Sequence, residues 1–511
     1  MRSQWPWWLA SGLAALGGLA LAAAFAPLGW WPLAPIGIAL ITLAVRSASL
    51  PAALLAGFVG GLAFNLLGLR FVAVVGTDAW LVVSAICALW VTLYALAVWL
   101  IRNLVWWPMA AAALWATIEG MQARWPWDGF AWLQVGFSQA DAPTVGLAAL
   151  GGMPLLGFVV ALAGSLLVFW VEGSDKVGRR LVLPLAAIAL MVSGVLVPRP
   201  IMGQNDRGPA ETRAAAVQGS VPEIGFEAKE QRQEVLENHV AVTMALAGEV
   251  NAGRQPRPDY VVWPENSSDV DPYLSKWAAG LISSAVDAIG VPVLVGAVTT
   301  SINPPAPSNV AIVWSPGTGP GEVYTKRHLL LFGEFVPFRS ALTAITDRYD
   351  RVPMDYAPGE HNGVLQLGSA TVGDVICYEI ADDQLVRREV VDGARLLTVQ
   401  TNNATFGMTS QPEQQLAMSR IRAIEHGRSV VIAATSGVTA IVIPDGTVAA
   451  RAAPNKGEAL VAPVPMRDTL TLSDRLQDLP VVVVALLAIL GLVFAFLTSR
   501  TSRSTRSTRT R

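Results

Sequence analysis

The sequence has little charge and little cysteine, and both scarcities narrow the class of protein. Charged residues make up 14% of the 511 residues and hydrophobic residues 53%, a balance too apolar for an ordinary soluble chain. The only cysteines are Cys87 and Cys377. Because Cys87 falls in a long apolar segment, Cys377 has no partner in its own stretch, which excludes a disulfide framework there.

Signals for metals and nucleic acids are also missing. The four histidines, His239, His328, His361 and His426, lack the spacing of metal ligands, so the sequence predicts no metal site. The net charge is −2 and no basic patch occurs in residues 199–477, which predicts no nucleic-acid partner.

What the chain does have is long apolar segments. A helix needs about 20 residues to cross ~30 Å of hydrocarbon. Segments of that kind lie at 6–26, 29–46, 50–69, 79–101, 104–121, 153–172, 180–198 and 479–498. We therefore predict a membrane α-helical bundle of about eight transmembrane helices. Residues 1–198 hold seven, residues 478–498 form the last, and the Arg/Ser/Thr tail at 499–511 is expected to be disordered and cytoplasmic. A cleaved signal peptide is the alternative for the first segment, disfavoured by the apolar segments that follow closely.

Basic residues predict the orientation, because Lys and Arg flank the cytoplasmic ends of membrane helices. Those that follow predicted helices are Arg46, Arg102, Lys176, Arg179, Arg180 and five arginines of the tail. Both termini are therefore expected inside, and seven helices before residue 199 place residues 199–477 on the extracytoplasmic side. Arg70 and Arg124 are exceptions to this pattern.

Residues 199–477 read as alternating strands and helices, which predicts an α/β domain. Apolar, β-rich runs typical of strands buried on both faces lie at 260–263, 293–298, 371–376, 396–399 and 430–434. Helical spacing occurs at 227–249, 274–289 and 411–426, the last followed by Gly427 as a stop.

Three residue types in this domain suit acyl chemistry. Cys377 and Glu265 each follow a predicted strand, and Lys326 lies between them in the sequence. A free cysteine has a pKa near ~8.5 and needs a base, for which a buried carboxylate such as Glu265 is a candidate. Lys326 and the backbone N–H after Cys377 would stabilise an oxyanion. Because sites in such sheets form at strand C-terminal ends, we expect Glu265, Cys377 and Asn402 to converge.

Taken alone, each of these residues also has a non-catalytic interpretation. Cys377 could be an inert core cysteine, Glu265 a surface carboxylate and Lys326 a solvated lysine. Their occurrence together in this order favours a catalytic site. A Cys/His hydrolase pairing Cys377 with His328 is the chemical alternative, but it leaves Glu265 and Lys326 unexplained.

The order Glu, Lys, Cys in an α/β domain resembles the nitrilase superfamily, and the apolar segments narrow this to bacterial apolipoprotein N-acyltransferases. The matching motifs run along nearly the whole chain, and together they are specific although each is weak alone. They include Phe25-Ala26-Pro27, Gly129-Phe130-Ala131-Trp132, Gly136-Phe137-Ser138-Gln139, Trp263-Pro264-Glu265, Tyr324-Thr325-Lys326, Phe332-Gly333-Glu334, Cys377-Tyr378-Glu379 and Thr435-Ser436-Gly437.

The resemblance implies a fold and a site. It implies an extracytoplasmic nitrilase-like αββα sandwich attached to membrane helices in the bacterial inner (plasma) membrane. The family's catalytic residues fall on Glu265, Lys326 and Cys377, and further positions that it needs around the site fall on Glu334, Tyr378 and Glu379.

The resemblance also implies a ping-pong reaction. A phospholipid donates an acyl chain to the cysteine, and the α-amino group of a diacylglyceryl-cysteine lipoprotein takes it as an amide. No metal and no diffusible cofactor are required. A membrane-tethered amidase acting on a small amide and a catalytically idle scaffold that binds lipoproteins remain as alternatives.

The chain departs from the family pattern at three positions. Asn403 and Thr405 stand where many members have Asp and Trp, and Ala131 stands in place of Pro. The first two are expected to alter acyl-chain or acceptor preference without touching the three catalytic residues. The apolar segment 329–338 is expected to form either an exposed lid at the bilayer or a buried core loop.

Overall fold

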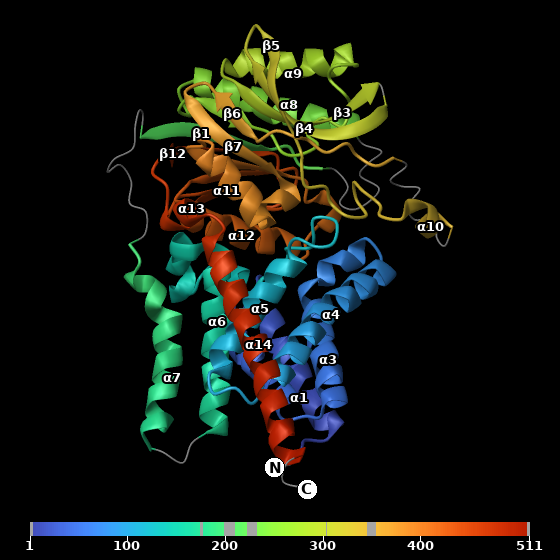
Figure 1. The fold of residues 1–511 in the computed structure, drawn as a ribbon. Helices are drawn as coiled ribbons and strands as arrows, with labels where there is room; N and C mark the ends of the chain where they lie inside the picture. Colours follow the sequence, from blue (N-terminus) through green and yellow to red (C-terminus); the bar gives the residue numbers. More distant parts are fainter. Residues whose placement is uncertain are drawn as a thin grey trace. The chain divides into compact units, whose positions relative to one another are not determined.

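A computed structural model describes residues 4–173, 177–198, 210–221, 232–302, 304–344 and 354–507. The chain forms two compact units (Figure 1). Residues 1–198 and 475–511 form one, the helical unit, and residues 199–474 form the other, the sheet unit.

The helical unit contains a helix in each of the eight predicted segments. Its long helices are α1 (Trp7–Ala24), α2 (Leu33–Arg46), α3 (Leu50–Gly68), α4 (Thr77–Ile101), α5 (Trp107–Gln122), α6 (Ala148–Glu172), α7 (Val177–Val192) and α14 (Leu479–Ser507). In the described part of the chain, five segments are long and apolar enough to cross a membrane: Trp7–Ala24, Leu50–Gly68, Thr77–Ile101, Pro143–Glu172 and Leu479–Ser499. Leu33–Arg46 and Leu181–Leu196 are shorter apolar helices. The unit is therefore a membrane helical part.

Small residues let these helices pack closely. A Cβ on Gly18 of α1 would lie 2.1 Å from the carbonyl oxygen of Gly60 in α3. A Cβ on Gly17 would lie 2.8 Å from the carbonyl oxygen of Gly37 in α2. Such close backbone approach replaces the hydrophobic driving force that is absent between helices in lipid.

The C-terminal tail differs from the prediction of a disordered segment. Helix α14 continues past residue 498 to Ser507, so the first part of the tail is helical. Extending an existing helix requires no new nucleation, and arginine is a good helix former, which explains the continuation. Arg509, Arg511 and the basic residue Lys176 lie outside the described residues.

The sheet unit contains twelve strands within the described residues. They are β1 (Glu211–Gln218), β2 (Tyr260–Val262), β3 (Val293–Ile302), β4 (Pro305–Ser315), β5 (Gly319–Thr325), β6 (Val364–Leu367), β7 (Ala370–Ile376), β8 (Leu396–Thr401), β9 (Val430–Ala434), β10 (Ala440–Val442), β11 (Val448–Arg451) and β12 (Glu458–Pro465). Helices α8 (Arg232–Asn251), α9 (Lys276–Ile289), α10 (Arg339–Thr343), α11 (Asp383–Val391), α12 (Gln411–His426) and α13 (Leu472–Leu476) join or follow them.

The strands form two six-stranded mixed sheets, in the orders β12-β1-β2-β3-β4-β5 and β11-β10-β9-β8-β7-β6. Each has three adjacent parallel strands, β1-β2-β3 and β7-β8-β9, with antiparallel strands outside them. Residues such as Val262 and Leu294 of the first sheet pack with Val372 and Ile376 of the second in one buried cluster. The sheets therefore pack face to face.

Helices cover the two outer faces. On the far face of the first sheet, Val261 and Val293 pack against Ile282 of α9 and Leu236 of α8. Helices α11 and α12 contact the second sheet (Figure 1). The sheet unit is thus the predicted αββα sandwich.

The predicted strands correspond to β2, β3, β7, β8 and β9, all of them parallel strands buried on both faces. The strands that were not predicted, apart from β1, are antiparallel strands at or next to a sheet edge. Their sequences mix apolar and polar residues, so they gave a weaker signal for a strand. The predicted helices at 274–289 and 411–426 are α9 and α12, and Gly427 ends α12 at φ +59°. The predicted helix at 227–249 is described from Arg232 onward, as α8.

His239 of α8 makes the stability of the sheet unit sensitive to acid. Its ring is fully buried 5.9 Å from the ring of Trp263, and burial lowers its pKa to about 4 despite the contact between Nδ1 and the Val235 carbonyl. Because the unfolded chain takes up a proton near pH 6.5, the free energy of unfolding is expected to fall between pH 6.5 and pH 4, by about 2 kcal/mol at pH 5.

The measurement is thermal unfolding of the full chain between pH 7.5 and pH 5. His239→Asn should remove most of the acid destabilisation, because asparagine does not titrate. His361→Gln, which changes an exposed histidine, serves as the matched control and should leave the pH dependence unchanged. Parallel pH profiles for wild type and His239→Asn would contradict the assignment.

Candidate active site

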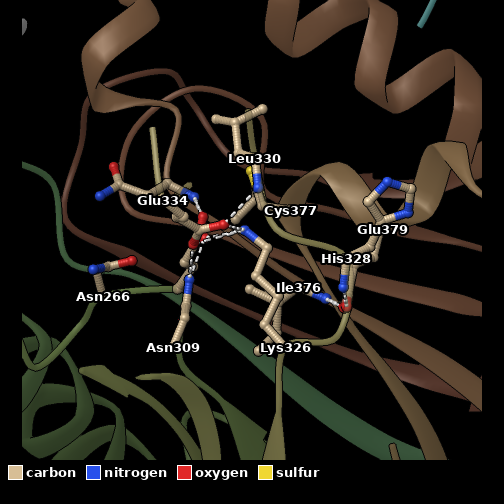
Figure 2. A network of polar contacts seen from close by, with 12 residues as sticks. Asn266, Asn309, Lys326, His328, Leu330, Glu334, Ile376, Cys377 and Glu379 are labelled. Atoms are coloured by element: carbon tan, nitrogen blue, oxygen red, sulfur yellow. Dashed lines mark hydrogen bonds and ion pairs between the residues drawn. The ribbon is translucent and has the colours of Figure 1, made fainter. Parts of the chain in front are cut away.

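The predicted catalytic residues lie just beyond strand C-terminal ends. Glu265 follows β2, Lys326 follows β5 and Cys377 follows β7. Figure 2 shows Lys326 extending toward Glu334 and the sulfur of Cys377, with Asn309 beside them. Because the two sheets pack face to face, residues separated by more than 100 positions meet in one buried cluster.

Lys326 lies between two carboxylates. Its Nζ is 3.2 Å from Oε1 of Glu265 and 2.9 Å from Oε2 of Glu334. Asn309 of β4 donates from Nδ2 to Oε1 of both glutamates, at 2.7 and 2.9 Å. The backbone N–H of Asn402 donates to the second oxygen of Glu265 at 2.8 Å. These contacts fix both carboxylates relative to the ammonium group.

The charge on Lys326 is secured by this arrangement. Its side chain is 2% exposed, and burial alone would lower its pKa. The carboxylates of Glu334 and Glu265 outweigh that effect and hold the pKa of Lys326 well above its ordinary value. The lysine is therefore a fixed cation, suited to stabilising a developing oxyanion rather than to accepting a proton.

Cys377 is a buried thiol in a strained backbone conformation. It is 8% exposed, and its φ of +56° is rare for a residue other than glycine and costs energy. Burial and then the Glu265 carboxylate raise the pKa of Cys377 to about 12, although Lys326 and Thr401 act in the opposite direction. The resting form is the neutral thiol, so a base has to remove its proton during the reaction.

A network of neutral side chains supports Cys377 from β8 and α12. Thr401 Oγ1 lies 3.4 Å from the Cys377 sulfur and 3.0 Å from Oε1 of Gln415. Gln415 in turn donates from Nε2 to the Cys377 carbonyl at 3.0 Å. Asn403 Nδ2 donates to Thr401 Oγ1 at 3.2 Å, to Gln415 Oε1 at 3.0 Å and to Gln411 Oε1 at 2.9 Å.

Thr401 has a single proton for two acceptors, so it can shift its hydrogen bond to sulfur when the thiolate forms. Thr401→Val is expected to slow Cys377 acylation by about tenfold or more, the worth of one hydrogen bond to a charged group. Thr435→Val, in a residue that contacts Asn402 and not the sulfur, is the control. Single-turnover acylation rates measure the effect, and an unchanged rate would exclude a role in stabilising the thiolate.

Glu379 connects the cysteine to the lysine segment. It is fully buried, and its carboxylate accepts hydrogen bonds from the N–H of Ile376 at 2.7 Å and the N–H of Arg327 at 2.8 Å. The Tyr324 hydroxyl donates to it at 2.9 Å. Burial raises the pKa of Glu379, and these donors oppose that shift. One carboxylate thus holds the strand end before Cys377 against the backbone next to Lys326.

The other residues considered in the sequence analysis, Tyr378, His328 and Asn402, lie at different positions around the site. Tyr378 is buried with its ring edge-on to His328, 5.2 Å away. His328 Nδ1 contacts Asp382 at 3.1 Å, and no contact between His328 and Cys377 occurs among the described residues, so the Cys/His arrangement is not formed. Asn402 joins the site through its backbone.

The apolar segment 329–338 is neither fully buried nor fully exposed. Phe338 is 70% exposed and Phe332 36%, whereas Val336 is buried. Glu334, within this segment, is fixed by the Leu330 N–H at 2.8 Å. The segment therefore combines an exposed aromatic surface with a residue of the site.

Sequence reasoning missed four contributors: Asn309, Thr401, Gln411 and Gln415. The one usable signal was Asn309, a lone amide in the apolar run of β4. The described residues contain no cluster of His, Cys, Asp and Glu that could hold a metal ion.

Known families match both units. Residues 17–166 match the apolipoprotein N-acyltransferase N-terminal domain, and residues 213–471 match carbon-nitrogen hydrolase. Apolipoprotein N-acyltransferase of Mycolicibacterium smegmatis is 36% identical over 451 residues, covering 84% of this chain and 75% of that protein. The enzyme of that name from Azotobacter vinelandii is 30% identical and covers 94% of each chain.

Among solved structures, a mutant amidase from Nesterenkonia sp. AN1 in complex with acrylamide is similar to 54% of this chain and 98% of its own, with 18% identity and a TM-score of 0.39. The family assignment follows from the sequence matches, which span both units and cover 75% and 94% of the two relatives. This chain belongs to the apolipoprotein N-acyltransferase family, within the nitrilase superfamily.

Proposed function

We propose that this acyltransferase moves an acyl chain from a phospholipid to the α-amino group of the N-terminal diacylglyceryl-cysteine of lipoproteins, through a thioester on Cys377. Family membership makes the chain a lipoprotein N-acyltransferase. The observation that carries the mechanism is the position of Lys326 between two carboxylates, with the thiol of Cys377 just beyond β7 of the facing sheet.

The first half-reaction forms the thioester. Glu265 takes the proton from Cys377, whose sulfur attacks the ester carbonyl carbon of the phospholipid. Lys326 and the N–H of Tyr378 stabilise the oxyanion of the tetrahedral intermediate. The intermediate collapses with cleavage of the C–O ester bond, and Glu265 returns its proton to the departing oxygen, so that lysophospholipid leaves.

The second half-reaction forms the amide. The neutral α-amine of the acceptor attacks the thioester carbonyl, and Glu265 takes one proton from the amine nitrogen. The C–S bond breaks, and Glu265 returns that proton to the Cys377 sulfur. No proton is gained or lost over the cycle, and neither a metal nor a cofactor takes part in any step.

We extend the proposal to the membrane arrangement: seven transmembrane helices within residues 1–198, one within 478–498, and a catalytic domain at 199–477 on the extracytoplasmic side. Contacts at the ends of α2, α4 and α6 support it. Arg46 pairs with Glu172 at 2.8 Å and donates to the Arg102 carbonyl at 3.0 Å. Basic residues that end different helices thus gather at one end of the bundle, as expected on the cytoplasmic side.

Intact-mass spectrometry tests the reaction. The purified chain is incubated with phospholipid alone, and an adduct of one acyl chain is expected on wild type and absent from Cys377→Ala. Adding a diacylglyceryl-cysteine peptide should move the acyl group to its amine. Loss of the adduct to water alone would indicate an amidase, and no adduct with any phospholipid would refute the thioester.

A further inference from the structure

The helical unit contains a cavity that the reaction proposed for the sheet unit does not use. It lies between α3, α4, α5 and residues 130–134. Its wall includes four large aromatic side chains, Trp90, Tyr94, Trp115 and Phe130, and one acidic side chain, Glu119. An acidic group within a membrane helix is costly, which marks it as a candidate functional residue.

Glu119 is held in place but has no counter-charge. Its Oε1 accepts a hydrogen bond from the N–H of Val135 at 2.8 Å, which fixes the side chain against the segment after the cavity wall. Among the residues that the structure describes, no lysine or arginine forms an ion pair with it. A cationic group on a ligand would supply the missing charge.

The aromatic side chains are arranged as a rigid wall. Tyr94 and Trp115 meet edge to face with ring centroids 4.9 Å apart, and the Tyr94 hydroxyl bonds with Thr42 at 2.8 Å. Trp115 is 4% exposed, and its indole N–H lies beside the Glu119 carboxylate. The aromatic wall and the acidic side chain therefore form one site.

We infer that this cavity binds the ammonium group of a lipid substrate. Aromatic faces beside a carboxylate attract ammonium ions through cation–π and charge interactions. A lipid that lacks the ammonium group cannot form this ion pair with Glu119.

The identity of the lipid rests on the proposed function. The proposed reaction has two substrates that can carry an ammonium group. One is the headgroup of an amine-bearing phospholipid donor. The other is the α-amino group of the diacylglyceryl-cysteine acceptor, bound in its protonated form before reaction. The chemistry of recognition is the same, and binding experiments separate the two.

The test measures equilibrium binding by native mass spectrometry on the full chain carrying Cys377→Ala, which prevents turnover. One arm compares an ethanolamine phospholipid with its N-acetylated derivative. The other compares a diacylglyceryl-cysteine peptide with its N-acetylated form. The ammonium form should bind about tenfold more tightly in at least one arm, and the arm in which it does identifies the source.

Glu119→Gln should abolish that preference, because the amide retains an oxygen for the Val135 N–H and loses the charge. Asp128→Asn removes one negative charge from an exposed position of the same unit and should keep the preference. Trp90→Leu leaves the Glu119 contact intact and should weaken the preference severalfold, which covers the case in which Glu119→Gln does not fold.

Equal binding of both forms in both arms, or a preference that survives Glu119→Gln, would overturn the inference. Failure of the proposed function is recognised separately, as the absence of an acyl adduct on a chain that retains Cys377.

Discussion

Replacing Glu265 with glutamine is expected to slow acylation of Cys377 by about 10²- to 10⁴-fold, the usual contribution of a general base. With the pKa of Cys377 raised to about 12, almost no thiolate forms at neutral pH without a base. Glutamine cannot take the proton. In the wild type, Asn309, Lys326 and the Asn402 N–H all donate to the Glu265 carboxylate. The N–H groups of a glutamine amide would face these donors instead of accepting from them.

The pH profile separates loss of the base from general damage to the site. In Glu265→Gln the thiolate has to form by loss of its proton to solvent, so the residual rate should rise with pH between about 6 and 9, below the pKa of Cys377. Glu334→Gln is the matched control. It removes a carboxylate that contacts the same lysine and the same asparagine, and it should keep the wild-type profile.

Single-turnover acylation followed by intact mass measures both variants. A Glu265→Gln rate within tenfold of wild type, or a profile parallel to that of wild type, would remove Glu265 from the role of base.

The sequence was sufficient to predict the parts of the site that depend on strand order. Strands buried on both faces give continuous apolar runs, and residues beyond their C-terminal ends converge whatever the details of packing. Glu265, Cys377 and Asn402 were placed together on that basis, and the contact between Glu265 and the Asn402 backbone bears this out. The role of Lys326 as the cation that stabilises the oxyanion was predicted from its chemistry, whereas Glu334 was identified only through the family resemblance.

The rest of the site depends on contacts that have no local signal. Asn309 reaches both carboxylates from an antiparallel strand whose register is set by its neighbours. Gln415 reaches the Cys377 carbonyl from a helix 38 residues away in sequence. The left-handed backbone of Cys377 is likewise imposed by its surroundings, because local preference for a non-glycine residue opposes it.

Each predicted apolar segment contains a helix, but the lengths of the helices were predicted less well. The second segment was expected from residue 29, but α2 begins at Leu33. Gly29 has φ +64°, and Pro32 caps the helix, so a turn occupies the first residues. Hydropathy does not distinguish such a turn from a helix, since Leu28, Trp30 and Trp31 are as apolar as the helix itself.

Lys326→Met is expected to destabilise the sheet unit by about 3–5 kcal/mol, because it leaves two buried carboxylates without their counter-charge. Lys326 contacts Glu265 at 3.2 Å and Glu334 at 2.9 Å. For a domain of this size, the unfolding temperature should fall on the order of 10 °C. The variant should also lose acylation activity by about 10²-fold or more, since the oxyanion loses a preorganised cation.

The loss of stability should be the same across neutral pH. The pKa of Lys326 is held well above its ordinary value, so its contribution is complete below about pH 10.4 and decreases only as pH rises through the folded-state pKa. The gap in unfolding temperature between wild type and Lys326→Met should therefore be constant from pH 7 to pH 9, beyond the range in which His239 titrates.

A double-variant cycle identifies the cause. Adding Glu334→Gln to Lys326→Met removes one of the two uncompensated charges, so the double variant should be more stable than Lys326→Met alone, whereas Glu334→Gln by itself should destabilise the wild type. Thermal unfolding of the full chain, followed by tryptophan fluorescence, measures all four proteins. If the two substitutions simply add, the charges are not coupled and the destabilisation comes from lost packing of the lysine side chain. If they restore stability as expected, the lysine both holds the two carboxylates together and supplies the positive charge of the active site.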